Sequence, residues 1–361
     1  MLRRLWMKLV DPIDAPLMTL VTALLAISLL GVVSASPERM TNQLLNIAVA
    51  LVVMRIAAQV PPQRLLHLAL PAYVIGIALL IAVALFGDIS KGARRWLNLG
   101  FMRIQPSELM KIAVPLMLAW FFQKNESALR MRDYAVAAIL LMVPVALIAK
   151  QPDLGTAILV FGAGFFVLFF AGLPWKVIIG FSAAGIAAAP VAWNFLHDYQ
   201  RGRILTLFDP EKDPLGKGFH IIQSTIAIGS GGILGKGWGQ GTQAQLEFIP
   251  ERHTDFILAV WAEEFGLLGN VLLLVLYSLL IGRGLIIAAN APTMFTRLLA
   301  GAVTLIFFTY AFVNIGMVSG ILPVVGVPLP LVSYGGTALV TLFVGIGILM
   351  SIHKNRMLVQ K

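Results

Sequence analysis

The sequence predicts an all-α polytopic membrane protein with about ten transmembrane helices. Of its 361 residues, 59% are hydrophobic and 12% are charged, whereas a soluble domain carries about 25% charged residues. The charges cluster between long apolar runs. One of these, Ala15–Ala35, contains no charged residue, and about 20 apolar residues are enough to cross a bilayer as a helix. A water-facing surface cannot be built from this composition.

The apolar runs place the predicted spans at 15–35, 43–59, 68–87, 106–123, 133–149, 154–172, 175–195, 255–281, 297–321 and 331–353. The sixth and seventh spans are joined by a few residues around Pro174, so we expect them to form a tight helical hairpin. No internal repeat or separate soluble domain is visible, and residues 1–361 are interpreted as a single transmembrane domain. Its one long loop, 196–254, separates the seventh and eighth spans.

Lysine and arginine residues set the predicted orientation, because short cytoplasmic loops are rich in them. Counted over the short loops, this bias places both termini in the cytoplasm and loop 196–254 outside. The net charge of +10 gathers at the ends of apolar runs, which is typical of membrane orientation rather than of a nucleic-acid-binding face. The absence of cysteine excludes a disulfide framework and a thiolate metal site.

Two outer loops contain several basic residues, against this orientation rule. The short loop 88–105 contains Lys91, Arg94, Arg95 and Arg103, and an anionic ligand at the outer leaflet would explain them. Loop 196–254 has six basic and six acidic residues, and long loops can escape the rule without any ligand. Loop 196–254 is also rich in glycine and contains an apolar stretch, 219–228, that predicts a short interfacial helix. An unstructured loop of this length is uncommon unless it is functional.

Ionisable residues inside predicted spans are costly, so each one is a functional hypothesis. Glu108 and Lys111 are spaced i,i+3 and can share one helix face; they either neutralise each other and lock two helices, or take part directly in catalysis. Asp153 lies near the same outer depth and can join their network. Glu263 and Glu264 lie roughly 12 Å along the eighth span from Asp255, which favours a structural role for both.

Asp255 stands at the outer end of the eighth span, where it joins the charged loop. There a carboxylate can meet both water and the head group of a lipid-linked substrate. Two interpretations stay open from the residues alone. Asp255 can act as a general base, or it can cap the N-terminus of the helix.

Several motifs resemble those of the SEDS family (shape, elongation, division and sporulation proteins), in family order and over essentially the whole chain. They are Lys91–Leu97, Gln105–Lys111, Gln151–Thr156, Pro250–Phe256, and Asn314–Gly320 followed by Leu322–Gly336. The phrases Asp209–Gly216 and His220–Ser224 are similar to the elongation branch of the family rather than its division branch. One departure is Thr337-Ala338, where family members often have two small hydroxyl residues or Ser-Ala.

The resemblance implies a peptidoglycan glycosyltransferase that polymerises lipid II, an undecaprenyl pyrophosphate-linked disaccharide-pentapeptide, into β-1,4 glycan strands during cell elongation. The family's essential aspartate corresponds to Asp255, which is expected to act as general base in an inverting displacement. Basic residues are expected to stabilise the leaving pyrophosphate; the candidates are Arg94, Arg95, Arg103, Lys111, Arg201 and Arg203. A supporting network is expected from Glu108, Asp153, Trp96 and His253, although for Trp96 an interfacial anchor is favoured over stacking on lipid or sugar.

The resemblance also implies partners and a location. The expected partners are a class B penicillin-binding protein that crosslinks the new strand, the rest of the elongation machinery, and membrane lipids. Nucleic acid is not expected as a partner. The expected location is the inner membrane, with the active site facing the periplasm. A divalent cation such as Mg²⁺ or Mn²⁺ is a candidate cofactor, although no metal motif is recognisable. Two other functions stay open, a lipid II flippase and a non-catalytic scaffold of the elongation machinery.

Overall fold

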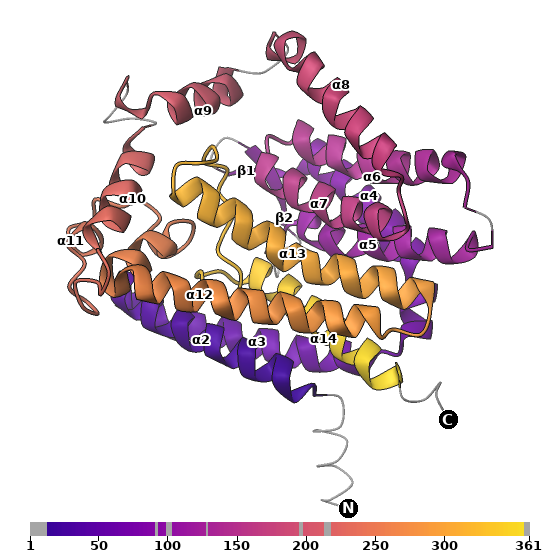
Figure 1. The fold of residues 1–361 in the computed structure, drawn as a ribbon, viewed down its shortest axis with the longest axis horizontal. Helices are drawn as coiled ribbons and strands as arrows, with labels where there is room; N and C mark the ends of the chain where they lie inside the picture. Colours follow the sequence, from indigo (N-terminus) through magenta and orange to yellow (C-terminus); the bar gives the residue numbers. More distant parts are fainter. Residues whose placement is uncertain are drawn as a thin grey trace, which may run out of the picture.

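A computed structural model describes residues 13–90, 93–98, 103–127, 129–194, 198–212 and 218–356. Lys91, Lys217, both chain ends and part of the Asp209–Gly216 phrase lie outside the described residues. All ten predicted spans correspond to helices (Figure 1). These are α2 (Ala15–Ala35), α3 (Met40–Gln59), α4 (Pro62–Phe86), α5 (Pro106–Lys124), α6 (Met131–Lys150), α7 (Leu154–Phe170), α8 (Trp175–Trp193), α12 (Ile257–Ala289), α13 (Met294–Val318) and α14 (Thr337–Arg356).

Seven of these helices in the described chain are long and apolar enough to cross a membrane by length and composition. The shorter apolar helix α7, and α5 with its Glu108 and Lys111, complete the bundle. Helix α13 is central, because it packs against α5, α7, α12 and α14 and is the most buried of the long spans. The all-α polytopic membrane fold is therefore confirmed.

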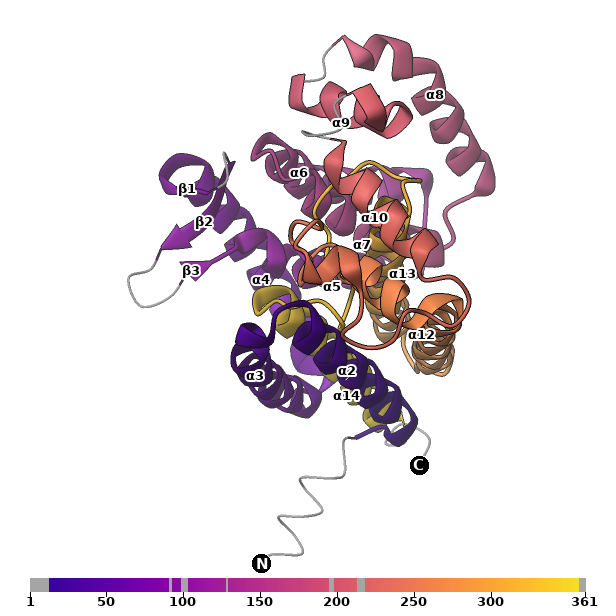
Figure 2. The ribbon, with the colours of Figure 1, turned by 90° about the vertical axis from the view of Figure 1, so that its left-hand side faces the viewer.

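The short basic loop folds into a small sheet, which the sequence did not predict. Strands β1 (Asp88–Ser90), β2 (Ala93–Asn98) and β3 (Arg103–Ile104) are antiparallel in the order β1-β2-β3. Leu97 pairs with Ile104 and Asn98 with Arg103. The sheet thus holds Arg94, Arg95 and Arg103 on one platform between α4 and α5, visible at the left of Figure 2.

The predicted hairpin of the sixth and seventh spans is wrong. The connection between α7 and α8 is short, and Phe169 contacts Trp175 at its start with ring centroids 5.7 Å apart. Beyond it α8 diverges from the bundle (Figures 1 and 2), and residues 183–191 are exposed throughout. A cavity of about 670 Å³ opens between α6, α7 and α8, lined by apolar side chains such as Leu141, Phe165 and Phe181. The alanine- and glycine-rich α8 has little side-chain volume with which to fill it.

The long loop is structured, with helix α9 (Asp198–Phe208), a 3-10 turn η2 (Pro210–Lys212), helix α10 (Phe219–Ser230) and the short helix α11 (Thr242–Gln245). Helix α10 confirms that residues 219–228 are helical, and the position of this helix at the membrane interface stays a prediction. Residues 218–254 cover the ends of α2 and α12 at the left of Figure 1. Arg252 Nε donates to the carbonyl of Ala35 at 2.6 Å and Gln245 Nε2 to that of Ser34 at 3.3 Å.

Helix α12 is interrupted at Gly266, whose φ of 62° is not helical. The glycine-rich segment 231–241 fills the break with backbone hydrogen bonds. Lys236 N donates to Glu263 O and Gly237 N to Glu264 O, both at 3.0 Å, while Leu267 N donates to Gly232 O at 2.9 Å. Non-helical backbone at membrane depth is tolerated where other protein groups satisfy it. The segment 231–241 of the long loop is therefore an integral part of the bundle.

The side chains of Glu263 and Glu264 also serve this junction. Glu263 is fully buried and accepts from Lys236 Nζ at 2.6 Å and Thr242 Oγ1 at 3.0 Å. Glu264 accepts a hydrogen bond from Ser34 of α2. Glu263 thus connects the segment 231–241 to α12, and Glu264 connects α2 to α12. This arrangement favours the structural role predicted for them.

Replacing Gly235 by alanine should destabilise the protein by more than about 2 kcal/mol, or abolish the folded yield. Gly235 has a φ of +81°, and an added Cβ would lie 2.1 Å from the carbonyl oxygen of Glu264. Gly239→Ala is the matched control, since its φ is +72° but nothing lies within 4 Å of the added Cβ. Thermal unfolding in detergent measures both. Equal unfolding temperatures for the two variants would show that the close approach at α12 is unimportant.

Candidate active site

Asp255 lies at the end of a series of turns, 251–256, immediately before α12. The N-cap residue of α12 is Phe256, and it makes no side-chain cap hydrogen bond. Asp255 is half-buried, while Phe256 and Ile257 behind it are buried. The position of Phe256 does not favour the helix-cap interpretation of Asp255.

The surroundings of Asp255 come from α13 and from the signature loop, which we define as residues 319–336. Asn314 Nδ2 donates to the backbone carbonyls of Asp255 at 2.8 Å and Val327 at 2.7 Å. Gly326 has a φ of +73°, and a methyl group added there would lie 3.3 Å from Asp255 Oδ2. The buried amide of Asn314 thus ties the signature loop to the residue that carries the carboxylate.

Two further contacts fix the signature loop against the turns before Asp255. Ser333 Oγ donates to the carbonyl of Thr254 at 2.6 Å and accepts from Leu329 N at 2.7 Å. Tyr334 N donates to the carbonyl of His253 at 2.9 Å, and the two rings meet edge-on. The backbone on either side of Asp255 is therefore held from the loop, which restricts where its carboxylate can point.

A second polar cluster surrounds Lys111 on α5. The ammonium group donates to Glu108 Oε1 at 2.6 Å and to the hydroxyl of Tyr310 on α13. The Lys111 side chain is 2% exposed and that of Glu108 is 12% exposed. Lys111 therefore bridges α5 to α13, an arrangement that favours the helix-locking interpretation of the pair over direct contact with a pyrophosphate.

Asp153 lies beside this cluster and connects it to the sheet. Its Oδ2 accepts from Gln105 Nε2 at 3.1 Å and lies 3.9 Å from Arg95 Nε. Arg95 also donates to the carbonyl of Pro152 at 2.6 Å. The structure thus brings together Arg95 and Asp153, a contact that was not predicted, with Gln105 as a further member.

The two clusters meet through α13 and the signature loop. Tyr310 and Asn314 are one turn apart on the same face of α13, so the helix links Lys111 to Asp255. At the start of α7, a Cβ on Gly155 would lie 2.7 Å from the carbonyl of Val325. Because Val325 adjoins Gly326, the close packing at Gly155 connects the Asp153 region to the loop facing Asp255.

The other candidate residues are placed less centrally. Arg94 and Arg103 are exposed on the sheet, and Trp96 is half-buried beside them. The structure does not bring Arg201 to Asp255, because its guanidinium donates to the carbonyls of Trp193 at 3.0 Å and Asn194 at 2.8 Å at the end of α8. Arg203 lies on the same helix α9, away from α12 and α13 in Figure 2.

His253 and His220 flank the turns before Asp255. Burial lowers the pKa of His253, and the charge of Arg39 lowers it further against the opposing Glu251. Burial likewise lowers the pKa of His220, which stacks on Phe256 at 5.5 Å, although Glu251 again opposes it. Both histidines are therefore held in the neutral form near pH 7.

The folded protein should lose stability as the pH falls below about 6.5. Both histidines have lowered pKa values in the folded state, so the unfolded chain binds more protons in this range. Thermal unfolding in detergent between pH 7.5 and 5.5 measures the effect. The double variant His220→Gln/His253→Gln should flatten the pH dependence, whereas the exposed His67→Gln should not. An unchanged slope in the double variant would contradict the assignment.

The described residues do not form a metal site of their own. In the ranges given above, no three histidine, aspartate or glutamate side chains converge as metal ligands, and the chain has no cysteine. A Mg²⁺ ion commonly uses one or two carboxylates together with substrate phosphates. The donor set around Asp255 thus does not fit a metal held by protein ligands alone, and we derive no step through one.

Tyr310 and Asn314 were not assigned roles from the sequence, although both stand in the ninth predicted span. An uncharged polar residue in an apolar helix is a weaker signal than a charge, yet it commonly finds a partner on a neighbouring helix. Tyr310 and Asn314 are both fully buried. Their spacing of four residues was visible in the sequence, but their partners were not.

A family model described as "Cell cycle protein", which covers FtsW, RodA and SpoVE, matches residues 12–358. The chain belongs to this family. It is 56% identical over 97% of its length to the peptidoglycan glycosyltransferase MrdB of Escherichia coli K12, of which 95% is covered. It is 38% identical over 76% of its length to the probable peptidoglycan glycosyltransferase FtsW of Geobacter metallireducens, of which 74% is covered.

Solved structures agree with this assignment. A chain from a peptidoglycan synthase complex described as coordinating polymerization and crosslinking matches with a TM-score of 0.82 and 37% identity. The match covers 95% of this chain and 98% of that one. The rod shape determining protein RodA of Thermus thermophilus matches with a TM-score of 0.72 and 31% identity, over 95% of this chain and 97% of that one. The chain is thus an integral membrane protein of this fold.

Proposed function

We propose that this chain is a peptidoglycan glycosyltransferase that polymerises lipid II, with Asp255 as the general base. The observation on which this proposal rests is the half-buried Asp255 at the end of a span, with its carboxylate close to Gly326 and its backbone carbonyl held by Asn314. The likeness to peptidoglycan glycosyltransferases over nearly the whole chain supports the reaction. The 56% identity to the MrdB of Escherichia coli, against 38% to the FtsW of Geobacter metallireducens, supports a role in elongation.

In the proposed step, the sugar 4-hydroxyl of an incoming lipid II attacks the anomeric carbon of the growing strand. The new C–O bond forms as the bond from that carbon to the lipid pyrophosphate breaks, and the electron pair leaves with the pyrophosphate. Asp255 takes the hydroxyl proton. An α-linked donor then gives a β-1,4 product by one inversion, so a single base suffices.

The leaving pyrophosphate gains charge in this step and requires fixed positive groups. Arg94, Arg95 and Arg103 on the sheet are the proposed ligands, since a guanidinium can bind two phosphate oxygens. Arg95 is anchored to Pro152 and Asp153 and remains 32% exposed, which supports it as the best-positioned of the three. Lys111 is proposed to act indirectly, by holding α5 against α13. Arg201 and Arg203 lie on α9, farther from Asp255, and are proposed to contact the pyrophosphate only from that side of the long loop.

The positive-inside bias supports placing this site on the periplasmic face of the inner membrane, with both termini in the cytoplasm. Segment 218–254 then forms one wall of an outward-facing site within a single transmembrane domain. The likeness to a chain from a synthase complex supports a class B penicillin-binding protein as partner. Elongation proteins and membrane lipids complete the proposed surroundings.

The test is polymerisation of fluorescent lipid II, already dissolved in detergent, by the purified full-length chain with its transpeptidase partner. Glycan strands resolved on a gel would support a polymerase, because flipping has no meaning without a bilayer. The break in α12 at Gly266 is a feature also seen in transporters. In transporters, however, such breaks occur at matched positions of internal repeats, and no internal repeat is visible in this sequence. A lack of product while vesicle-reconstituted protein translocates lipid II would favour the flippase instead.

A further inference from the structure

The incoming lipid II keeps its own pyrophosphate while its 4-hydroxyl reacts, so a site at Asp255 holds two anionic groups at the same time. Arg94, Arg95 and Arg103 on the sheet are the proposed ligands of the pyrophosphate that leaves. The pyrophosphate that stays requires a positive group of its own, on another element near Asp255.

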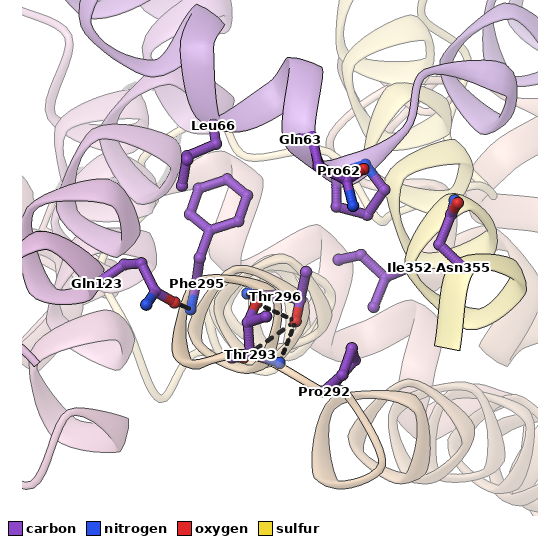
Figure 3. Close-up of a pocket in the computed structure, with 10 residues that line it drawn as sticks. All are labelled: Pro62, Gln63, Leu66, Gln123, Pro292, Thr293, Phe295, Thr296, Ile352 and Asn355. Carbon is purple, nitrogen blue, oxygen red and sulfur yellow. Dashed lines mark hydrogen bonds between the residues drawn. The ribbon is translucent and has the colours of Figure 1, made fainter. Parts of the chain in front are cut away.

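The pocket between α4, α5, α13 and α14 does not supply this group (Figure 3). None of its lining side chains is charged, and Gln123, Thr293 and Thr296 are already bonded within the protein. The pocket also lies at the start of α13, whereas Asn314, which holds the backbone of Asp255, stands near the end of that helix. The second positive group therefore belongs at the other end of α13.

Arg39 stands there, in the connection between α2 and α3. It is the last residue of the 3-10 turn η1 (Pro37–Arg39), and its guanidinium lies 5.2 Å from the centroid of the Tyr334 ring in the signature loop. The Arg39 side chain is 42% exposed. In the described part of the chain its Nε has no hydrogen-bond partner, and its charge is paired only loosely, with the exposed Glu38 at 3.9 Å. The ring thus positions the guanidinium, and its charge is available to a ligand.

Tyr334 connects Arg39 to the turns before Asp255. The amide of Tyr334 donates to the carbonyl of His253 at 2.9 Å, and the two rings meet edge-on with centroids 5.6 Å apart. Burial is the largest cause of the lowered pKa of His253, and the charge of Arg39 is the next. Arg39 therefore acts electrostatically on the backbone segment that carries Asp255.

The connection that carries Arg39 is fixed on both sides. Gln43 on α3 is fully buried, and its Nε2 donates to Ser28 Oγ of α2 at 3.0 Å and to the carbonyl of Ser333 in the signature loop at 3.4 Å. Arg252 Nε donates to the last carbonyl of α2 at 2.6 Å. These contacts hold η1 against both the signature loop and the turns 251–256, so the position of Arg39 is preformed.

Arg39 and the sheet reach the signature loop at different points. The sheet side meets the loop at Val325, through the start of α7, whereas Arg39 covers Tyr334. Figure 2 shows the sheet beside α4 and α3 beside α2, at separate places around the same end of the bundle. Two pyrophosphates can therefore be held on separate elements around Asp255.

We propose that Arg39 binds the pyrophosphate of the incoming lipid II, while the sheet arginines hold the pyrophosphate that leaves. A guanidinium can present two N–H groups to phosphate oxygens in one plane. The phosphate displaces Glu38 readily, because an exposed ion pair is weak. The Tyr334 ring restricts the guanidinium before the substrate arrives, which lowers the entropy lost on binding. This inference rests on the proposed polymerase reaction.

The test uses the purified full-length chain with its transpeptidase partner in detergent. The donor is a labelled short glycan strand on lipid pyrophosphate with its terminal 4-hydroxyl blocked, and lipid II is the acceptor. The acceptor pyrophosphate carries the same charge before and during the reaction, so Arg39→Gln should raise the KM for lipid II by about fivefold or more and leave kcat nearly unchanged. The KM for the donor strand should not change.

Two variants serve as controls. Arg39→Lys keeps the charge without the planar fork, so it should recover part of the lost affinity. Lys212→Gln removes an exposed basic residue from η2 of the long loop and should leave both KM values unchanged. An equal rise of the donor and acceptor KM in Arg39→Gln would indicate a general charge effect and overturn the assignment, as would an unchanged acceptor KM.

A binding measurement separates a failure of this inference from a failure of the proposed polymerase. Native mass spectrometry compares lipid II with undecaprenol, which has the same chain but no phosphate. Arg39→Gln should weaken the binding of lipid II and leave that of undecaprenol unchanged. If the wild type made no strand, the polymerase would fail, and equal lipid II binding by both proteins would overturn the role of Arg39 independently.

Discussion

Replacing Asp255 by asparagine should reduce the rate of glycan polymerisation by about 10²–10⁴-fold, the usual contribution of a general base. Asparagine has nearly the same shape but cannot take the proton of the attacking hydroxyl. The backbone carbonyl that accepts from Asn314 is unchanged, so the fold around position 255 should be retained. The measurement is the initial rate with detergent-dissolved lipid II and the transpeptidase partner.

The matched control for Asp255→Asn is Glu247→Gln, which removes an exposed carboxylate from the same loop. Glu247 is 74% exposed and pairs with Arg252 at 2.9 Å, and exposed pairs contribute about 0–1 kcal/mol. This variant should polymerise at nearly the wild-type rate. If Asp255→Asn also retained the wild-type rate, Asp255 would not be the base, and the scaffold interpretation would gain support.

The membrane fold was predictable because the bilayer imposes a length and a composition on each span. All ten spans were placed near their helices, although several ends differ. Helix α14 begins at Thr337 instead of 331, because Leu331–Gly336 belong to the signature loop that reaches across to His253 and Thr254. The predicted tight hairpin of α7 and α8 was wrong because contacts with distant parts of the chain decide this feature too. A short connection fixes where α8 begins but not its direction, which depends on packing.

The candidate site was predicted in part. Charges at unfavourable depths identified Asp255, Lys111, Glu108 and Asp153, because an ionisable group in a membrane requires a reason. Sequence alone did not indicate that the basic loop 88–105 would form a sheet, because its strands are too short to give a clear alternating pattern. It also did not show that residues 231–241 would fill a break in α12. The contacts that fill this break join residues far apart in the chain, such as Lys236 and Glu263, and no local periodicity records them.

Replacing Lys111 by methionine should destabilise the protein by about 3–5 kcal/mol, because it leaves the carboxylate of Glu108 buried without its partner. Tyr310 would also lose its hydrogen bond from Lys111. The free energy of unfolding in detergent, or the folded yield, measures this loss. The control Lys124→Met removes an exposed lysine from the same helix and should change stability by no more than about 0.5 kcal/mol.

The double variant Glu108→Gln/Lys111→Met separates the two roles left open for Lys111. Removing both charges should restore much of the stability, since no buried charge is left unpaired and only the hydrogen bond to Tyr310 is still lost. If Lys111 locks α5 to α13, the restored protein should also polymerise lipid II. If Lys111 instead contacts the pyrophosphate, the double variant would fold but stay inactive. The comparison of stability with rate therefore decides whether Lys111 acts through the helix packing or on the substrate itself.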